Sequence, residues 1–234
     1  MRTMKVTVGE IKSFALKYND MQYFTEDPVI FPRHFAARGT CLQDVEIAAV
    51  FAAHLAWGRR CMIVRDCRKA FDQMDWKPYE YVMRGKYRDE AVSLHRTVMW
   101  SEFAAICSRL RHLYENCSTL EKLSPDGFRT EVFGQKSDLR AANKKIHLLR
   151  RWMVRRDGKV DIGLWKDTDP ASLTIPLDTH VHTQAVDLGI TCRRQTDFRT
   201  ADEITGFFRE IFPDDPVLGD YALFGLGVTG VRLK

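Results

Sequence analysis

A chain of 234 residues, 45% hydrophobic and 11% aromatic, is long and apolar enough to bury a substantial core, which excludes an intrinsically disordered protein. The formal net charge of +5 is a mild basic excess, and it suits a polyanionic partner only where the positive groups are clustered. No run of about 18 apolar residues occurs, so no membrane span is expected. The six cysteines follow no short-spaced framework and the N-terminal stretch lacks the apolar core of a signal peptide, so we expect reduced thiols and a cytoplasmic location.

The N-terminal segment is predicted to be a helix followed by an ordered loop. Residues 7–18 have amphipathic helical spacing. Asp27-Pro28 and Phe31-Pro32 then favour extended or turn backbone, because the residue before a proline avoids the helical region. We therefore expect irregular backbone around both prolines.

The most apolar helix is predicted to begin at a capping box, Thr40-Cys41-Leu42-Gln43. The residues from Val45 to Ala56 are apolar nearly all round, which is typical of a buried helix. Gly58 interrupts this pattern, and a second helix is expected from about Cys61 to Met74. The sequence thus predicts two helices whose connecting turn carries Trp57, Arg59 and Arg60.

The middle of the chain carries no recognisable chemistry. We expect a turn over residues 78–87, a helix from about Val92 to Tyr114, and no strong pattern over residues 118–138. Cys107, His112 and Cys117 are spaced at intervals of five residues, which fit no common zinc pattern. No metal site and no cofactor are expected.

The most basic segment is a predicted helix from Leu139 to about Arg156. At about 100° per residue, one of its faces is apolar, formed by Ile146, Leu149 and Met153. Another face is cationic, formed by Lys144, Arg151 and Arg155. A solvated face is the ordinary explanation, but solvated faces usually mix both signs of charge. The single sign favours a phosphate-binding role, for Lys145 as well.

The stretch IPLDTHVHTQAVDLGI, residues 175–190, places an aspartate where a helix is predicted to begin. Asp178 precedes apolar residues at helical spacing, so it is expected to be the N-cap. Free backbone N–H groups at a helix start favour an ionised carboxylate and fix its direction. Two roles stay open for Asp178: an ordinary cap, which is the commoner role, or a catalytic carboxylate at the mouth of a cleft.

Helices are also predicted for about Arg199 to Phe212 and for Gly219 to Leu226. Apolar residues recur at helical intervals throughout the chain, and alternating apolar runs are scarce. The sequence therefore predicts an all-α fold with almost no strand.

Two motifs resemble the helix-hairpin-helix DNA glycosylase superfamily. Leu177-Asp178-Thr179-His180-Val181 is similar to the Val-Asp-Thr-His-Val-type stretch that carries the catalytic aspartate of that superfamily, and residues 220–227, DYALFGLG, resemble its closing helix. Four segments also resemble an uncharacterised bacterial family, a domain of unknown function, which supplies relatives but no activity: DPVIFPRHF, LLRRWMVRRDGKVDIGLW, IPLDTHVHTQAVDLGI and DDPVLGDYALFGLGV.

The resemblance to glycosylases implies a two-lobed, all-α fold in which residues 1–234 form one glycosylase-like unit. The central helical lobe would span approximately residues 40–135, and the N-terminal segment with approximately residues 136–234 would form the second lobe. The cleft between the lobes would hold Lys144 and Asp178. The resemblance also assigns to Trp57, Arg59 and Arg60 the loop that wedges into DNA, although a buried tryptophan beside two solvated arginines is the ordinary alternative.

By the same resemblance Lys144 is the candidate nucleophile, because some glycosylases attack the sugar C1′ with a lysine at the start of such a helix. The hairpin that precedes this lysine in the superfamily is replaced here by Gly134–Leu139, so Lys145 is the competing choice. Asp178 would stabilise the oxocarbenium-like sugar that forms when the glycosidic bond breaks.

The expected function is a DNA base-excision glycosylase, with or without a lyase step, that acts as a monomer on a damaged base in double-stranded DNA, by analogy an oxidised purine. Four residues are then expected to contact the nucleic acid besides the wedge loop and the catalytic pair: Lys145, Arg151, Arg155 and His180. The alternative is a non-catalytic nucleic-acid-binding protein on the same scaffold. A metal hydrolase would need a metal at His180 or His182, but positions two apart on a helix point in different directions.

Overall fold

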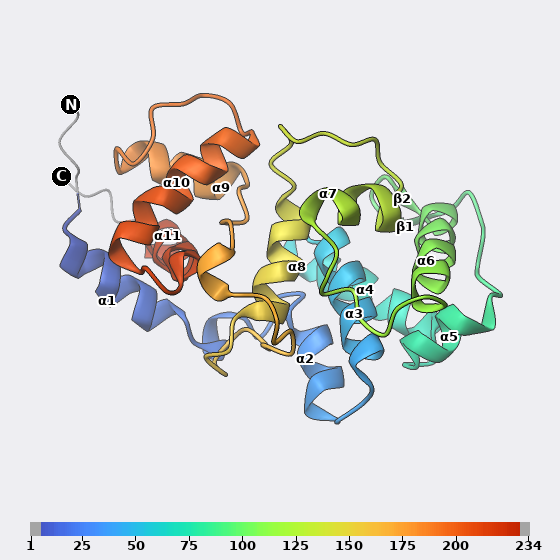
Figure 1. Ribbon diagram of the computed structural model, residues 1–234. Coiled ribbons are helices and arrows are strands. Elements are labelled where there is room, and N and C mark those ends of the chain that lie inside the picture. The colour runs from blue at the N-terminus through green and yellow to red at the C-terminus, as the bar shows by residue number, and fades with distance from the viewer. Residues whose placement is uncertain (1–5, 230–234) are drawn as a thin grey trace. The chain divides into compact units, whose positions relative to one another are not determined.

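Helices make up almost all of the regular structure in the computed structural model, which describes residues 6–229 (Figure 1). Strand structure within this range is confined to a short antiparallel hairpin of β1 (Ser93–His95) and β2 (Val98–Met99). The prediction of a mostly helical fold is therefore confirmed. In the same range no helix is both long and apolar enough to cross a membrane.

The chain divides into two compact units. The terminal unit combines the segment through Tyr23 with the segment from Asp138 onward, and the central unit is Phe24–Ser137. The described elements of the terminal unit are α1 (Val8–Tyr18), the 3-10 turn η1 (Met21–Tyr23), α8 (Lys144–Val154), η3 (Pro170–Ser172), α9 (Thr179–Asp187), α10 (Phe198–Ile211), η4 (Pro216–Leu218) and α11 (Gly219–Thr229). Those of the central unit are the β-hairpin, α2 (Ile30–Ala37), α3 (Leu42–His54), α4 (Arg60–Gln73), α5 (Pro78–Arg84), α6 (Trp100–Tyr114), α7 (Pro125–Gly127) and the π-helical turn η2 (Phe128–Val132).

Helix α3 is the core of the central unit, because its residues from Val45 to His54 are all buried. One of them is acidic. The Glu46 carboxylate accepts hydrogen bonds from the Tyr114 hydroxyl at 2.9 Å and the Thr119 hydroxyl at 2.6 Å, and from the backbone N–H of Leu120 at 3.0 Å. A buried carboxylate needs such partners, so these bonds fix α3 against α6 and the segment that follows it.

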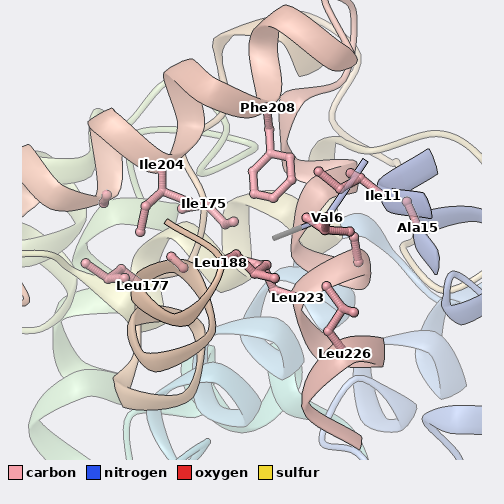
Figure 2. Close-up of a cluster of buried hydrophobic side chains, with 13 residues drawn as sticks. Val6, Ile11, Ala15, Ile175, Leu177, Leu188, Ile204, Phe208, Leu223 and Leu226 are labelled. Carbon is pink, nitrogen blue, oxygen red and sulfur yellow. The ribbon is translucent and has the colours of Figure 1, made fainter. Parts of the chain in front are cut away.

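The apolar core of the terminal unit gathers side chains from α1, α10 and α11 and from the segments beside α9 (Figure 2). Figure 2 shows Ile204 and Phe208 projecting from α10 into this cluster, with Ile175 and Leu177 of the segment before α9. Leu177 is 2% exposed. The residue that precedes Asp178 is therefore held by the core.

Two prolines predicted to lie outside helices instead lie at helix starts. Pro32 is in the first turn of α2, so the loop predicted there is wrong. Pro78 opens α5, where the sequence predicts a turn. A proline near a helix start loses no intrahelical hydrogen bond, and its fixed φ suits the helix, so neither residue breaks its helix.

Three other predicted boundaries differ from the structure. Helix α6 begins only at Trp100, because the β-hairpin occupies the residues just before it. Helix α8 begins at Lys144 rather than at residue 139, because Asn143 adopts a left-handed conformation with φ 46°. The predicted capping box is absent, since the Thr40 hydroxyl donates to the Phe35 carbonyl at 3.3 Å.

Two helical glycines of the terminal unit should respond oppositely to alanine. A Cβ on Gly225 would lie 2.1 Å from the Tyr18 ring, whereas a Cβ on Gly206 would meet nothing within 4 Å. We expect Gly225→Ala to lower the free energy of unfolding by about 1–3 kcal/mol through overpacking. Gly206→Ala should raise it by about 0.5–1 kcal/mol because alanine favours helix. Urea unfolding followed by circular dichroism measures both, and equal stability of the two variants would contradict this packing.

Candidate active site

A lysine and an aspartate from the starts of two helices meet in the terminal unit. Lys144 is the first residue of α8, and Asp178 is the N-cap of α9. The Lys144 Nζ lies 3.4 Å from the Asp178 Oδ2, and the two side chains are 30% and 32% exposed. The fold thus brings together the two residues that the sequence selected as a catalytic pair and leaves both open to solvent.

The Asp178 carboxylate has a fixed direction. Its Oδ1 accepts the backbone N–H groups of His180 at 2.9 Å and Val181 at 3.0 Å, which confirms the predicted N-cap. The ion pair with Lys144 uses the other oxygen, Oδ2. Because one oxygen is anchored by two amides, the second keeps a defined position toward the amine.

The segment before Asp178 is anchored to α10. The backbone N–H of Ile175 donates to the Thr205 hydroxyl oxygen at 3.0 Å, and both residues are buried. The Thr205 hydroxyl in turn donates to the Ala201 carbonyl at 2.6 Å, which fixes its rotamer. Helix α10 therefore positions the aspartate without contributing a side chain to the ion pair.

The apolar face of α8 holds the lysine end of the helix in place. Ile146, Leu149 and Met153 are fully buried, as the sequence predicts. His147, one turn after Lys144, is also buried, and its ring stacks on Phe198 at 6.3 Å between centroids. Burial, together with the charge of Arg150, lowers the pKa of His147 to about 4, so this imidazole is neutral at physiological pH.

The other residues expected around the pair lie on the same two helices. Lys145 follows Lys144 and is half-buried. The His180 side chain is exposed on the first turn of α9. The His182 ring turns elsewhere, because its Nε2 lies 2.8 Å from the Arg193 carbonyl oxygen. Among the described residues, no group of three or more His, Cys, Asp or Glu side chains is arranged to hold a metal ion.

Arg151 and Arg155 do not form an exposed cationic stripe. They are 4% and 1% exposed, so the prediction that they present charge to a phosphate requires correction. The reason is that both arginines form ion pairs with a set of carboxylates, which the helical periodicity of α8 does not reveal. We call this set, with the two arginines, the ion cluster: Arg151, Arg155, Asp157, Asp161, Asp215, Asp220 and Tyr221.

Arg155 is the centre of the ion cluster. Its guanidinium donates to both oxygens of Asp215, with Nε–Oδ1 2.9 Å and Nη2–Oδ2 2.8 Å, and to Asp157 at 2.8 Å. It also forms an ion pair with buried Asp161. Burial lowers the pKa of Arg155, but the neighbouring carboxylates outweigh burial and raise it well above its usual value.

Arg151 and Tyr221 complete the ion cluster. Arg151 donates through Nε to Asp161 at 3.3 Å and forms an ion pair with Asp220. The Tyr221 hydroxyl donates to Asp161 at 2.8 Å, and the Arg151 guanidinium lies 4.7 Å from the Tyr221 ring centroid. The cluster therefore ties α8 to the first turn of α11.

The segment after α8 has a structural role. The backbone N–H of Ile162 donates to the Trp152 carbonyl at 2.7 Å, and that of Trp165 donates to the Met153 carbonyl at 2.8 Å. These bonds satisfy carbonyls that a helix end leaves without intrahelical partners. They also hold Asp161 against the two arginines.

Asp220 links the ion cluster electrostatically to the candidate catalytic pair. Burial raises the pKa of Asp220 and the Arg151 guanidinium lowers it, while the charges of Asp178 and Asp161 raise it further, to about 6 in total. A carboxyl that gains and loses a proton near neutral pH therefore lies within electrostatic reach of Asp178.

The predicted wedge residues lie in the turn between α3 and α4 of the central unit and at the first residue of α4, Arg60. Trp57, Arg59 and Arg60 are all exposed, and Trp57 at 37% is not a core residue. The Arg96 guanidinium lies over the Trp57 ring, 4.6 Å from its centroid. The turn therefore presents an aromatic ring and cations on the surface of this unit.

A buried histidine contacts the backbone of this turn. The His95 Nε2 lies 2.9 Å from the Trp57 carbonyl oxygen, and its Nδ1 lies 2.9 Å from the Asp66 carboxylate. Burial raises the pKa of Asp66, but hydrogen bonds from Arg65 and His95 outweigh it, and the result is about 2. An ionised buried carboxylate thus holds the imidazole against the backbone of the turn.

The family model of DUF2400, described as a protein of unknown function, matches residues 27–132 and 124–229. These segments cover most of the chain. The chain belongs to the DUF2400 family. Comparisons with curated proteins and with solved structures found no match.

In this DUF2400 member, sequence reasoning missed the acidic half of the ion cluster. Asp161, Asp215 and Asp220 are absent from the site expected from the sequence, because none of them lies on the predicted helix from Leu139 to about Arg156 that carries the arginines. A signal was present, since Asp157 and Asp161 follow Arg155 within six residues. With acids so close in the sequence, an arginine face of one sign is as consistent with ion pairs as with a stripe exposed to solvent.

Two cations, Lys144 at the start of α8 and Arg155 at its C-cap, should therefore differ sharply in their effect on stability. Arg155→Ala removes one of the two guanidinium partners of buried Asp161 and the partner of the partly exposed Asp157 and Asp215, so we expect the free energy of unfolding to fall by about 3–5 kcal/mol. Lys144→Gln removes one half of a partly exposed ion pair and should change it by less than about 1 kcal/mol. Chemical unfolding of both variants measures this difference, and a mild effect of Arg155→Ala would be inconsistent with the ion cluster.

The raised pKa of Asp220 predicts a pH-dependent stability. The folded chain takes up a proton at Asp220 near pH 6, whereas the unfolded chain takes it up near the usual value of 3.8. Between these two values the folded state binds more protons, so this group makes the free energy of unfolding fall as the pH rises from about 4 to 6. We expect wild type to lose on the order of 2 kcal/mol relative to Asp220→Asn across this window. A difference between the two proteins that stays constant from pH 4 to 7 would refute it.

Proposed function

We propose that this DUF2400 protein is a DNA base-excision glycosylase with a lyase step, that it acts on double-stranded DNA as a monomer, and that its fold is the two-lobed glycosylase-like one. The observation that carries the proposal is the distance of 3.4 Å between the Lys144 Nζ and the Asp178 Oδ2. A nucleophilic amine beside a directed carboxylate is the pair that this chemistry needs.

In the proposed reaction, the bond between the base nitrogen and C1′ breaks and its electron pair leaves with the base. Asp178 stabilises the positive charge that develops on the sugar, with one oxygen held by the amides of His180 and Val181. The Lys144 amine then supplies the electron pair for a new bond to C1′. Opening of the C1′–O4′ bond gives the Schiff base, and O4′ takes up a proton.

Before it attacks, the Lys144 ammonium must lose a proton. The Asp178 Oδ2 is the nearest acceptor in the ion pair, so the same carboxylate is suited to receive it. The partial exposure of both side chains supports access by a substrate from solvent.

The proposed DNA contacts are exposed or half-buried residues. Lys145 and His180 flank the pair, and the wedge loop with Trp57, Arg59 and Arg60 supplies an aromatic ring and two cations. Arg151 and Arg155 are left out because the ion cluster buries them. The proposed lesion is an oxidised purine, which rests on analogy with glycosylases alone.

Borohydride trapping tests the proposed mechanism. Reduction should freeze a covalent complex between wild-type protein and a duplex that carries an oxidised purine or an abasic site, because the Schiff base contains Lys144. Lys144→Gln should abolish trapping. Asp178→Asn keeps most of the capping geometry but removes the stabilising charge, so base release should slow by about 10²–10³.

Two control variants make this test specific. Lys159→Gln removes an exposed lysine elsewhere in the terminal unit and should leave trapping unchanged. Trapping that survives in Lys144→Gln but is lost in Lys145→Gln would move the nucleophile by one residue. Salt-dependent duplex binding with no trapping and no base release on a panel of damaged duplexes would replace the enzyme with a non-catalytic nucleic-acid-binding protein.

A further inference from the structure

A surface cavity of about 660 Å³ lies within the central unit, on residues that neither the glycosylase resemblance nor the candidate pair uses. It is formed by α2, the start of α3, α4 and the turn that follows α4. Its size is within the range of small-molecule sites, roughly 300–1,000 Å³. The cavity is therefore large enough for a ligand that combines a ring system with a charged group.

One side of the cavity is aromatic. The Trp76 ring centroid lies 6.2 Å from that of Phe31, 5.9 Å from that of Phe35 and 5.1 Å from that of His34. Phe31 and Phe35 are buried and form a rigid base, whereas Trp76 is half-buried and His34 is exposed. The Trp76 indole N–H donates to Asp72 at 2.8 Å, which fixes the ring plane. Aromatic surface is thus available at the cavity wall.

The backbone that presents Trp76 has an unusual conformation. Asp75 and Trp76 have φ angles of 51° and 53°, and residues other than glycine rarely adopt this left-handed region. Two consecutive residues of this kind, directly after α4, turn the chain back so that Trp76 packs on α2. Such conformations persist where the surroundings determine them, and they gather at ligand sites.

The cavity lining is also charged, and its cations outnumber its carboxylates. Three cations line it, Arg38, Arg68 and Lys77, together with two carboxylates, those of Asp44 and Asp75. The Arg38 and Arg68 side chains are exposed. The Arg68 guanidinium lies 5.9 Å from the Trp76 ring centroid. Burial lowers the pKa of His34, and the charges of the nearby Arg38 and Arg68 guanidiniums lower it further.

We propose that this cavity binds a nucleotide, with the aromatic base against Trp76 and His34 and the phosphate on Arg38 and Arg68. Base stacking on aromatic side chains tolerates every base, and guanidinium groups match a phosphate in bidentate geometry. A purely apolar ligand would leave the cations of the lining unused. Inorganic phosphate alone would leave the aromatic wall unused.

Two forms of nucleotide could supply this base and phosphate, a free mononucleotide and a nucleotide within a single strand. Calorimetric titration of the full chain with AMP and with an oligothymidylate distinguishes them, and adenosine and inorganic phosphate serve as the half-ligands. We expect AMP or the oligonucleotide to bind at least about tenfold more tightly than either half-ligand, because only a nucleotide uses both the aromatic wall and the cations. The proposal would be overturned if neither nucleotide binds, or if neither binds more tightly than inorganic phosphate.

Variants identify the cavity as the site. The double variant Arg38→Gln with Arg68→Gln should weaken nucleotide binding by about tenfold or more, since it removes two charge-assisted contacts. His34→Ala should weaken it severalfold through lost stacking, with little risk to the fold because the side chain is exposed. The matched control is Lys86→Gln with Lys122→Gln, which removes the same charge from exposed positions of the central unit outside the cavity.

The control should bind as wild type does, and a loss equal to that of the arginine variant would reduce the effect to net charge and refute the assignment. Lys144→Gln should also bind nucleotide normally. This outcome separates the cavity from the proposed glycosylase site, so either proposal can fail alone.

Discussion

The ion cluster around Arg155 is the interaction on which the terminal unit depends. The Arg155 guanidinium contacts carboxylates from the segment after α8 and from the segment before α11. One of these carboxylates, Asp157, also accepts a hydrogen bond from Asn19 at the end of α1. Buried charges are tolerated only when they are paired and hydrogen-bonded, so all of these segments must be in place together. The register of α8 is fixed as a result, and with it the position of Lys144 at the start of the helix.

Much of the helical fold could be predicted because it follows local rules. The apolar face of α8 and the N-cap at Asp178 both depend on residues within a few positions along the chain. The misplaced elements have local causes as well. Pro32 suggested a loop, but its place in the first turn of α2 decides the outcome, and the sequence around it does not mark that turn.

The candidate site also contains residues that local sequence could predict and residues that it could not. Asp178 could be selected from its own helix start, whereas Lys144 could be joined to it only through the resemblance to glycosylases, because no spacing rule links residues so far apart. The fate of Arg151 and Arg155 depends on acids distant in sequence, notably Asp215 and Asp220. A helix face of one charge has the same pattern whether it meets solvent or buried carboxylates, so periodicity alone cannot separate a phosphate-binding stripe from an ion cluster.

The composition of the ion cluster has a consequence for the candidate pair. Two guanidiniums face four carboxylates, of which Asp161 and Asp220 are buried, so the cluster holds more negative than positive charge. The raised pKa of Asp220 relieves this excess, and the charge of Asp178 is one of its causes. Electrostatic coupling is reciprocal, so a proton on Asp220 removes negative charge from the surroundings of Asp178. The cluster that positions Lys144 therefore also tunes the field in which its partner carboxylate acts.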